Sequence, residues 1–466
     1  MKFGLIVGNR SFFPAHLAEE DRRRVLDKLV KMGHEAITLA PEQTPHGAVM
    51  TYSDAKACAE LFRCHSDEID GIIVVLPNFG TETAIADAIE KSGLRVPVLV
   101  QACDDDFDHL EIANRRDAFC GKISVCNNLY QRGIRFTGTG THTCAIESEE
   151  FTRDLTFFAG VCRVVRGLSG ARIGAIGARP DAFHTVRFSE KLLQASGVTV
   201  VTADLSEIIF RAAAMQDDDP PVKAKEEEIR AYGRIANGIS REKVLRQAKL
   251  CLTLEQWVQE NDCACSAIQC WDSIQFNYGC ATCLAMSMMG EKGRPSACEM
   301  DVTGALTMYA MKLASGEPSG YLDWNNNYGE DRDKCICLHC SNFPKSFFRT
   351  DFEIENLDVL ATTIGAEKCF GACKAQIAPG RMTYGKISTD DRNGRIRAYF
   401  GEGEILPDRV DTKGGVALCH IPDLQGLLKF ITHNGFEHHV AMNRSLCADV
   451  LEEALGNYLS WDVTRH

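Results

Sequence analysis

Residues 70–80 read DGIIVVLPNFG, an unbroken apolar run that ends at Pro, Asn and Gly. Similar runs precede and follow it, FGLIVGN at 3–9 and VPVLVQAC at 96–103. The segments between them have helical patterning, as in LAEEDRRRVLDKLVKMG at 17–33. Continuous apolar strands alternating with amphipathic helices predict a parallel sheet that helices cover on both faces.

The same pattern restarts at GARIGAIGARP (170–180), which reads as a strand with a Gly-rich end. A helical segment at 186–197 and a strand at 198–205 follow, so we expect a second α/β domain. The glycines of the restart do not have the G-x-G-x-x-G spacing, and we predict no NAD. From about residue 346 the β-formers alternate with turn residues, and DRNG at 391–394 predicts a hairpin.

The expected fold class is therefore α/β, with two doubly wound parallel-sheet domains followed by a smaller, β-rich, barrel-like domain. The predicted boundaries are 1–167 for the N-terminal α/β domain, 168–345 for the second and 346–466 for the C-terminal domain. A chain of 466 residues is too long for one hydrophobic core, which agrees with several domains.

Composition excludes some partners. The formal charge of −13 opposes binding to nucleic acid or to an anionic membrane, because both are negatively charged. No apolar stretch approaches the ~20 residues that a membrane span needs, and no targeting segment is recognisable. With 21 cysteines and no secretion signal, we expect reduced thiols and a cytoplasmic protein.

Two acids stand in apolar surroundings, Glu299 in CEMD (298–301) and Asp323 in YLDWNNNYG (321–329). Each is expected near a strand end, and acids at neighbouring strand ends converge. Convergent carboxylates repel unless a cation lies between them, so the pair predicts a divalent metal. Asp301 precedes a helical segment and is expected to cap it.

Histidines supply the remaining candidate ligands. His339 lies in CLHCSN, and His438 and His439 lie in GFEHHVAMN. If the pair lies in a strand, its two side chains face opposite ways, so one binds metal while the other packs or contacts substrate. Carboxylates with one or two imidazoles form a hard O/N set that suits Mn²⁺ or Mg²⁺.

The thiols offer a rival interpretation, a cysteine-rich zinc or iron–sulfur protein with a redox or scaffold role. Nine cysteines lie between Cys263 and Cys340, including the C-x-x-C pair Cys280 and Cys283. Zinc usually takes two such pairs, and we expect the C-x-C spacing of Cys335 and Cys337 to separate their sulfurs. The alternative to both is that these cysteines are buried core residues.

The segments CEMDVTGALTMYAM, LDWNNNYG, LHCSN and EHHVAMN together resemble the L-fucose/L-arabinose isomerase superfamily, and SAIQCWDSIQFNYGCATCLAMSMM resembles its fucose isomerase-like branch. The resemblance implies a divalent-metal-dependent aldose–ketose isomerase that acts on an open-chain sugar through an enediol. It implies Glu299, Asp323 and His439 as metal ligands, and His339 as either a metal ligand or a substrate contact. Glu299 and Asp323 are also the expected catalytic acid–base pair.

Substrate contacts are expected from Trp271 and Trp324, which can stack on a sugar, and from Asn325, His438 and Arg10. Arg10 follows the first strand and suits an anionic group such as a sulfonate; a surface arginine is the alternative. The substrate is a neutral sugar such as L-fucose or L-arabinose, or an anionic hexose such as sulfoquinovose. The resemblance also implies a homo-oligomer.

Overall fold

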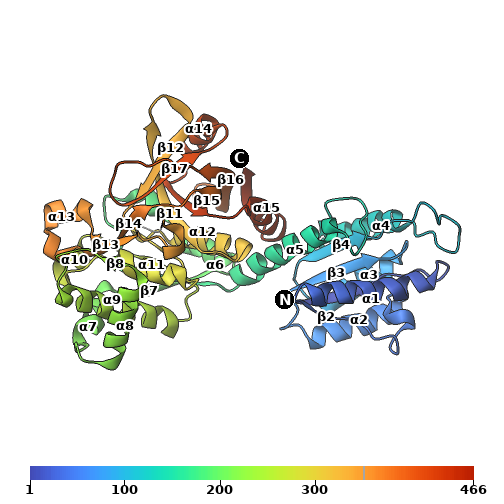
Figure 1. Ribbon diagram of the computed structural model, residues 1–466. Coiled ribbons are helices and arrows are strands. Elements are labelled where there is room, and N and C mark those ends of the chain that lie inside the picture. The colour runs from blue at the N-terminus through green and yellow to red at the C-terminus, as the bar shows by residue number, and fades with distance from the viewer. Residues whose placement is uncertain (350–351) are drawn as a thin grey trace. The chain divides into compact units, whose positions relative to one another are not determined.

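The computed structural model describes residues 1–349 and 352–466. The chain divides into two compact units, Met1–Arg166 with Glu453–Ser460, and Gly167–Glu452 with Trp461–His466 (Figure 1). Helix α5 (Glu149–Leu168) leads from the first unit into the second. None of the helices in these described ranges is long and apolar enough to cross a membrane.

The first unit is built on a parallel sheet with strand order β2-β1-β3-β4-β5. Its strands are β1 (Lys2–Val7), β2 (Glu35–Ile37), β3 (Gly71–Leu76), β4 (Val98–Ala102) and β5 (Thr137–Gly138). Its other helices are α1 (Ala15–Lys31), α2 (Tyr52–Cys64), α3 (Glu82–Ser92) and α4 (Ala118–Gln131). Every residue of β3 is buried, as expected for a central parallel strand that helices cover on both faces.

The late segment Glu453–Ser460 belongs to this first unit although it lies near the C-terminus. Its Tyr458 hydroxyl donates to the Val98 carbonyl over 3.2 Å, next to the edge strand β5.

The second unit begins with a smaller parallel sheet of order β10-β9-β6-β7. Its strands are β6 (Arg172–Ile176), β7 (Thr199–Ala203), β9 (Cys265–Ile268) and β10 (Ser296–Ala297). The helices before residue 292 are α6 (Glu190–Ala195), α7 (Leu205–Ala214), α8 (Pro220–Tyr232), α9 (Arg241–Glu260), α10 (Ser273–Asn277) and α11 (Cys283–Glu291). Helix α12 (Val302–Ser315) follows β10, and Asp301 caps it by accepting from the Gly304 amide over 2.7 Å, as predicted.

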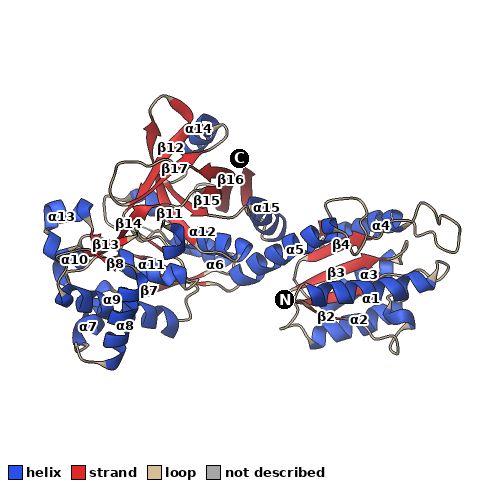
Figure 2. Cartoon of the chain, viewed as in Figure 1, coloured by secondary structure: helices blue, strands red, loops and turns tan. Residues whose placement is uncertain are grey.

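A larger mixed sheet completes the second unit, in the order β19-β16-β15-β18-β11-β12-β17-β14-β13-β8. Its strands are β8 (Arg234–Ile235), β11 (Ser319–Tyr328), β12 (Asp331–His339), β13 (Glu353–Asn356), β14 (Phe370–Gln376), β15 (Gly380–Asp390), β16 (Arg395–Ile405), β17 (Gly415–His420), β18 (His439–Asn443) and β19 (Asp462–Arg465). An additional pairing of β16 with β17 closes a ring of neighbouring strands, which we call the β-ring and which consists of β16, β15, β18, β11, β12 and β17. Figure 2 draws the strands of the chain in red. Helices α13 (Asp358–Ile364), α14 (Leu424–Asn434) and α15 (Ala448–Glu452) belong to the same unit.

The predicted fold class is confirmed: two parallel α/β sheets precede a barrel-like β-rich part. The predicted hairpin at 391–394 is also confirmed, because β15 and β16 pair in register from Asp390–Arg395 to Gly380–Ile405. The strands β11 and β12 at 319–339 hydrogen-bond within the large sheet together with the later strands. The three-domain division at 167 and 345 stays a prediction.

Candidate functional site

Three neighbouring strands of the β-ring each contribute one titratable side chain to a single point. Asp323 on β11 is paired in register with His439 on β18. On its other side Asp323 is paired with Leu338 of β12, the residue before His339. Neighbouring strands lie about 4.8 Å apart. The register therefore places one histidine on each side of Asp323, His439 on β18 and His339 on β12.

Glu299 reaches the same point from the connection between β10 and α12. Its φ is 60° and that of Met300 is 59°, so two consecutive residues other than glycine are left-handed. This conformation costs about 1 kcal/mol or more for each residue and is concentrated at functional sites. The turn directly precedes Asp301, the N-cap of α12.

The distances define a compact group, which we call the carboxylate–imidazole cluster: Glu299, Asp323, His339 and His439. The Nε2 atom of His439 lies 2.8 Å from Glu299 Oε2 and 3.5 Å from Asp323 Oδ1. The Nε2 atom of His339 lies 4.0 Å from Glu299 Oε2 and 3.8 Å from Asp323 Oδ1. Within the two described ranges, Glu299, His339 and His439 form one group with metal-ligand spacing, and Asp323, His438 and His439 form the other.

Burial and charge act strongly on this cluster. Burial opposes ionisation of Glu299, but the hydrogen bond from His439 and the charges of His339 and His439 hold the Glu299 pKa at about 2. Burial likewise opposes charge on His439, yet its bonds to Asp301 and Glu299 raise the His439 pKa to about 9. The cluster therefore strongly favours a positive charge at Nε2 of His439.

The donor set fits a hard divalent cation. Asp323 Oδ1 is buried and has no hydrogen-bond partner, although three imidazole Nε2 atoms surround it within 4.0 Å. A buried carboxylate oxygen without a partner is costly, and a cation removes that cost. Two carboxylates with imidazole nitrogens match the preference of Mn²⁺ or Mg²⁺.

The other predicted contact residues fall into two sets. Trp271 is in the site, because its indole Nε1 donates to Glu299 Oε1 over 3.1 Å. His438 Nε2 lies 4.0 Å from Asp323 Oδ1. Trp324 instead donates to the Tyr399 hydroxyl over 3.0 Å and packs into the core.

Asn325 and Arg10 are held by other partners. The Asn325 side chain accepts from the Leu338 amide over 2.6 Å. Arg10 lies in the first unit, donates to the Gly80 carbonyl over 2.7 Å and forms an ion pair with Glu82.

Two geometric expectations were wrong. His438 and His439 do not face opposite ways, since their ring centroids are 4.3 Å apart and both rings lie beside Asp323. His438 precedes the first residue of β18, so strand alternation does not apply to it. Cys335 and Cys337 are not separated either, because residues two apart in a strand share a face and their sulfurs lie 3.8 Å apart.

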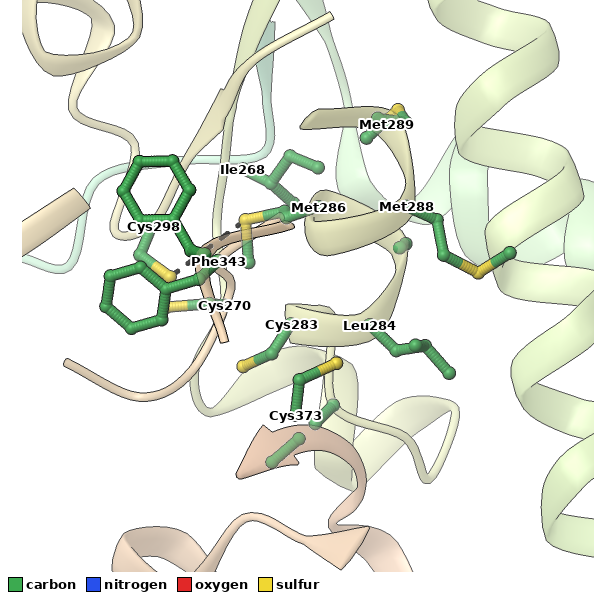
Figure 3. Packing of buried hydrophobic residues seen from close by; sticks show 14 of the residues in the cluster. Ile268, Cys270, Cys283, Leu284, Met286, Met288, Met289, Cys298, Phe343 and Cys373 are labelled. Carbon is green, nitrogen blue, oxygen red and sulfur yellow. Dashed lines mark hydrogen bonds between the residues drawn. The ribbon is translucent and has the colours of Figure 1, made fainter. Parts of the chain in front are cut away.

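The thiol-rich region behind the cluster packs as core. Figure 3 shows Cys270, Cys283 and Cys298 among Met286 and Phe343. The Cys298 sulfur lies 3.9 Å from the Met286 sulfur, and all five side chains are buried. Burial is the main cause of the raised pKa of the Cys270 thiol, which keeps it protonated. The metal-spaced groups found in the described part of the chain contain no cysteine.

Sequence reasoning missed Phe183, which contacts Trp271, His438 and His439 with ring centroids 5.4–5.9 Å apart. It also missed a pocket of about 670 Å³, whose lining includes Met300, the residue after Glu299, and Glu437, two residues before His439. Four arginines share this lining, and we call it the arginine pocket: Arg179, Arg187, Arg392 and Arg397. The run ARPDAFHTVR at 178–187 supplies two of them and Phe183, but it has no periodic pattern that would have placed it.

Two family models and several curated relatives match this chain. Residues 4–169 match the family model of the fucose/sulfoquinovose isomerase N-terminal domain, and residues 337–466 match that of the L-fucose isomerase C-terminal domain. The chain is 24% identical over 297 residues to a sulfoquinovose isomerase of Alkalicoccus urumqiensis, with 63% of this chain and 64% of the relative covered. It is 25% identical over 181 residues to one of Priestia aryabhattai, with 39% and 40% covered. The matched regions thus span less than two thirds of either relative.

Proposed function

Because this chain belongs to the fucose isomerase-like family of sugar isomerases, we propose that it is a divalent-metal-dependent aldose–ketose isomerase. The observation that carries the proposal is the meeting of Glu299, Asp323, His339 and His439 at one point, with the unpartnered oxygen of Asp323 facing it. These four residues would hold Mn²⁺ or Mg²⁺. A bound ion would polarise the carbonyl of an open-chain sugar and acidify the neighbouring C–H bond.

The chain's own groups would then move the proton. One carboxylate of the Glu299–Asp323 pair removes the proton from C2 of the aldose, and the C1–C2 enediol forms as the carbonyl oxygen gains a proton. The same carboxylate or its partner returns a proton to C1 while the C2 hydroxyl gives up its own proton, which gives the ketose with no net redox change. Trp271 donates to Glu299 and orients that carboxylate. Phe183 packs against the rings of His438 and His439.

Metal binding is expected to release a proton. Below about pH 9 the metal-free His439 imidazole is protonated, because bonds to two carboxylates raise its pKa to about 9. A ligating imidazole must be unprotonated, so the apparent Mn²⁺ affinity should rise about tenfold per pH unit up to about pH 9 and then level off. Calorimetric titration at pH 7.5 in two buffers of different ionisation enthalpy measures the released protons; a value near zero would contradict ligation by His439.

The arginine pocket supports an anionic sugar as substrate. Arg179 donates to the carbonyls of Pro180 and Asp181 over 2.6 and 2.7 Å, and Arg397 donates to those of Asn434 and Gly435 over 2.5 and 3.0 Å. These guanidinium groups are bonded to main-chain carbonyls, so their charge is available to a ligand.

Three acids of the lining do not cancel that charge. Asp390 is paired with Arg395 over 3.3 Å, Asp391 is exposed, and burial raises the pKa of Glu437, which disfavours its charged form. The relatives named sulfoquinovose isomerases act on a sulfonated hexose by name, and we propose the same substrate class for this chain.

A substrate screen tests both parts of this proposal. The Mn²⁺-loaded protein is incubated with L-fucose, L-arabinose, D-arabinose and sulfoquinovose, and ketose formation is measured. Turnover of sulfoquinovose above that of the neutral sugars is expected. If only neutral sugars are converted, the proposed sulfonated substrate is wrong but the isomerase activity stands. If no sugar yields a ketose, the result counts against the isomerase activity and the substrate class together.

Removal of one arginine from the pocket should weaken the sulfonated substrate alone. We expect Arg179→Met and Arg392→Met to raise KM for sulfoquinovose about tenfold or more, since a hydrogen bond to a charged group contributes about 1.5–3 kcal/mol. Arg381→Met is the matched control, because Arg381 lies in the same hairpin but is exposed and outside the lining of the pocket. KM values are measured for all three variants; equal effects in the control would show that the pocket does not bind the sulfonate.

The cytoplasmic location and the homo-oligomeric state belong to the proposal as well. All 21 cysteines are free thiols, which is typical of proteins in a reducing compartment. The proposal of a homo-oligomer is based on the family resemblance alone.

A further inference from the structure

A lysine is buried behind the carboxylate–imidazole cluster without touching it. Lys386 lies in the middle of β15 and is 0% exposed. Its ammonium group forms an ion pair with Asp301, which is also 0% exposed. Burying a charged pair costs several kcal/mol per ion before the attraction is counted, so such pairs are weak evidence for stability. The position of this pair points to a role in the site.

Asp301 is saturated with donors. Its Oδ1 accepts from the Gly304 amide over 2.7 Å and from the Thr303 hydroxyl over 3.0 Å, which anchors it to the start of α12. Its Oδ2 accepts from Lys386 and Tyr321. Both oxygens are therefore fixed from several directions, and the carboxylate cannot rotate.

The same Oδ2 lies 3.0 Å from Nδ1 of His439, and the Tyr321 oxygen lies 2.6 Å from that nitrogen. The single proton of the Tyr321 hydroxyl goes to Asp301, so the Tyr321 oxygen is an acceptor toward His439. Nδ1 of His439 therefore carries the proton that faces the Tyr321 oxygen and Asp301 Oδ2. Nε2 is left to face Glu299 and Asp323 at 2.8 and 3.5 Å.

Glu437 is the other acid near this lysine, but it is held elsewhere. Its Oε1 accepts from the Ser388 hydroxyl over 2.7 Å. Asp301 is thus the direct partner of the Lys386 charge.

We propose that Lys386 is a positioning residue for the metal site: it anchors the Asp301 carboxylate, which fixes the tautomer and the orientation of His439. The inference rests on the proposed metal-dependent function. Partners of this kind behind metal-ligating histidines typically contribute 10- to 100-fold to metal affinity. Neither Lys386 nor Asp301 is required to contact the metal or the sugar.

A double-mutant cycle on Mn²⁺ affinity tests this proposal. Metal-free wild type, Lys386→Met, Asp301→Asn and the double variant are titrated with Mn²⁺ by calorimetry, after thermal unfolding has shown that each is folded. We expect Lys386→Met to weaken binding about 10- to 100-fold. If the lysine acts through Asp301, the double variant binds no more weakly than Asp301→Asn alone. Ile387→Val, a buried neighbour on the same strand, should bind Mn²⁺ within about twofold of wild type.

The outcomes separate this inference from the proposed function. Wild type that binds no Mn²⁺ would overturn both. If wild type and Lys386→Met bind Mn²⁺ equally well, the inference alone is overturned. It is also overturned if the double variant loses Mn²⁺ affinity by the product of the two single losses, because the two residues then act independently. If Lys386→Met does not fold, Lys386→Gln replaces it in the cycle, because Gln keeps a hydrogen-bond donor without the charge.

Discussion

The Glu299→Gln variant is expected to lose about 10³-fold or more in kcat for aldose–ketose isomerisation. Gln has nearly the same shape but can neither take a proton nor offer a charged oxygen, and general acid–base groups alone typically contribute 10²- to 10⁴-fold. His439 would also lose its 2.8 Å contact with a carboxylate. Asp323→Asn should behave alike, since it removes the charge on the oxygen that lacks a partner. Ketose formation under saturating Mn²⁺ and sugar measures both variants.

A matched control is available on the same hairpin as Asp323. Glu330 lies in the turn between β11 and β12 with a side chain that is 96% exposed, and Glu330→Gln should keep wild-type kcat. Substantial turnover by either cluster variant would remove Glu299 or Asp323 from the acid–base role. A loss in Glu330→Gln of similar size would show that the assay reports a general effect of charge.

The two adjacent histidines should respond very differently to the same substitution. His439→Gln is expected to weaken Mn²⁺ binding at least about 100-fold, because it removes a buried ligand together with the contacts to Asp301 and Tyr321. His438 is 42% exposed in its side chain, and His438→Gln should change Mn²⁺ affinity less than about fivefold while raising KM for the sugar. Burial lowers the His438 pKa, which leaves this imidazole neutral for contact with substrate.

Calorimetric Mn²⁺ titration and sugar KM values for both variants decide between the two histidines. Equal loss of metal affinity would mean that the ion sits in the group of Asp323, His438 and His439. Loss in His438→Gln alone would reverse the assignment. Because the two side chains are neighbours in sequence, each variant is the control for the other.

The fold was accessible from sequence because its signal is local. Strand β3 is buried along its whole length, and its apolar run predicts a covered parallel strand without knowledge of its neighbours. The cap at Asp301 was predictable for the same reason, since it depends on the residues that follow it.

The site was accessible only in part because its geometry is non-local. The candidates Glu299, Asp323, His339 and His439 were identified from residue type and resemblance, but the register that aligns Asp323 with His439 joins distant segments. The contact of Asp301 with His439 likewise depends on α12 meeting β18, and nothing in either segment alone predicts it. Local patterns do not predict the arginine pocket either, because residues near 179–188 and residues of the β15–β16 hairpin line it together.

Closure of the β-ring fixes the main chain around three residues of the carboxylate–imidazole cluster. His439, Asp323 and His339 lie on three consecutive strands, each of which has a partner on both sides. Fraying any of them requires two ladders of main-chain bonds to open at once. The scaffold therefore holds these three side chains in place by itself, and the proposed ion would bind and leave without refolding of the protein around it.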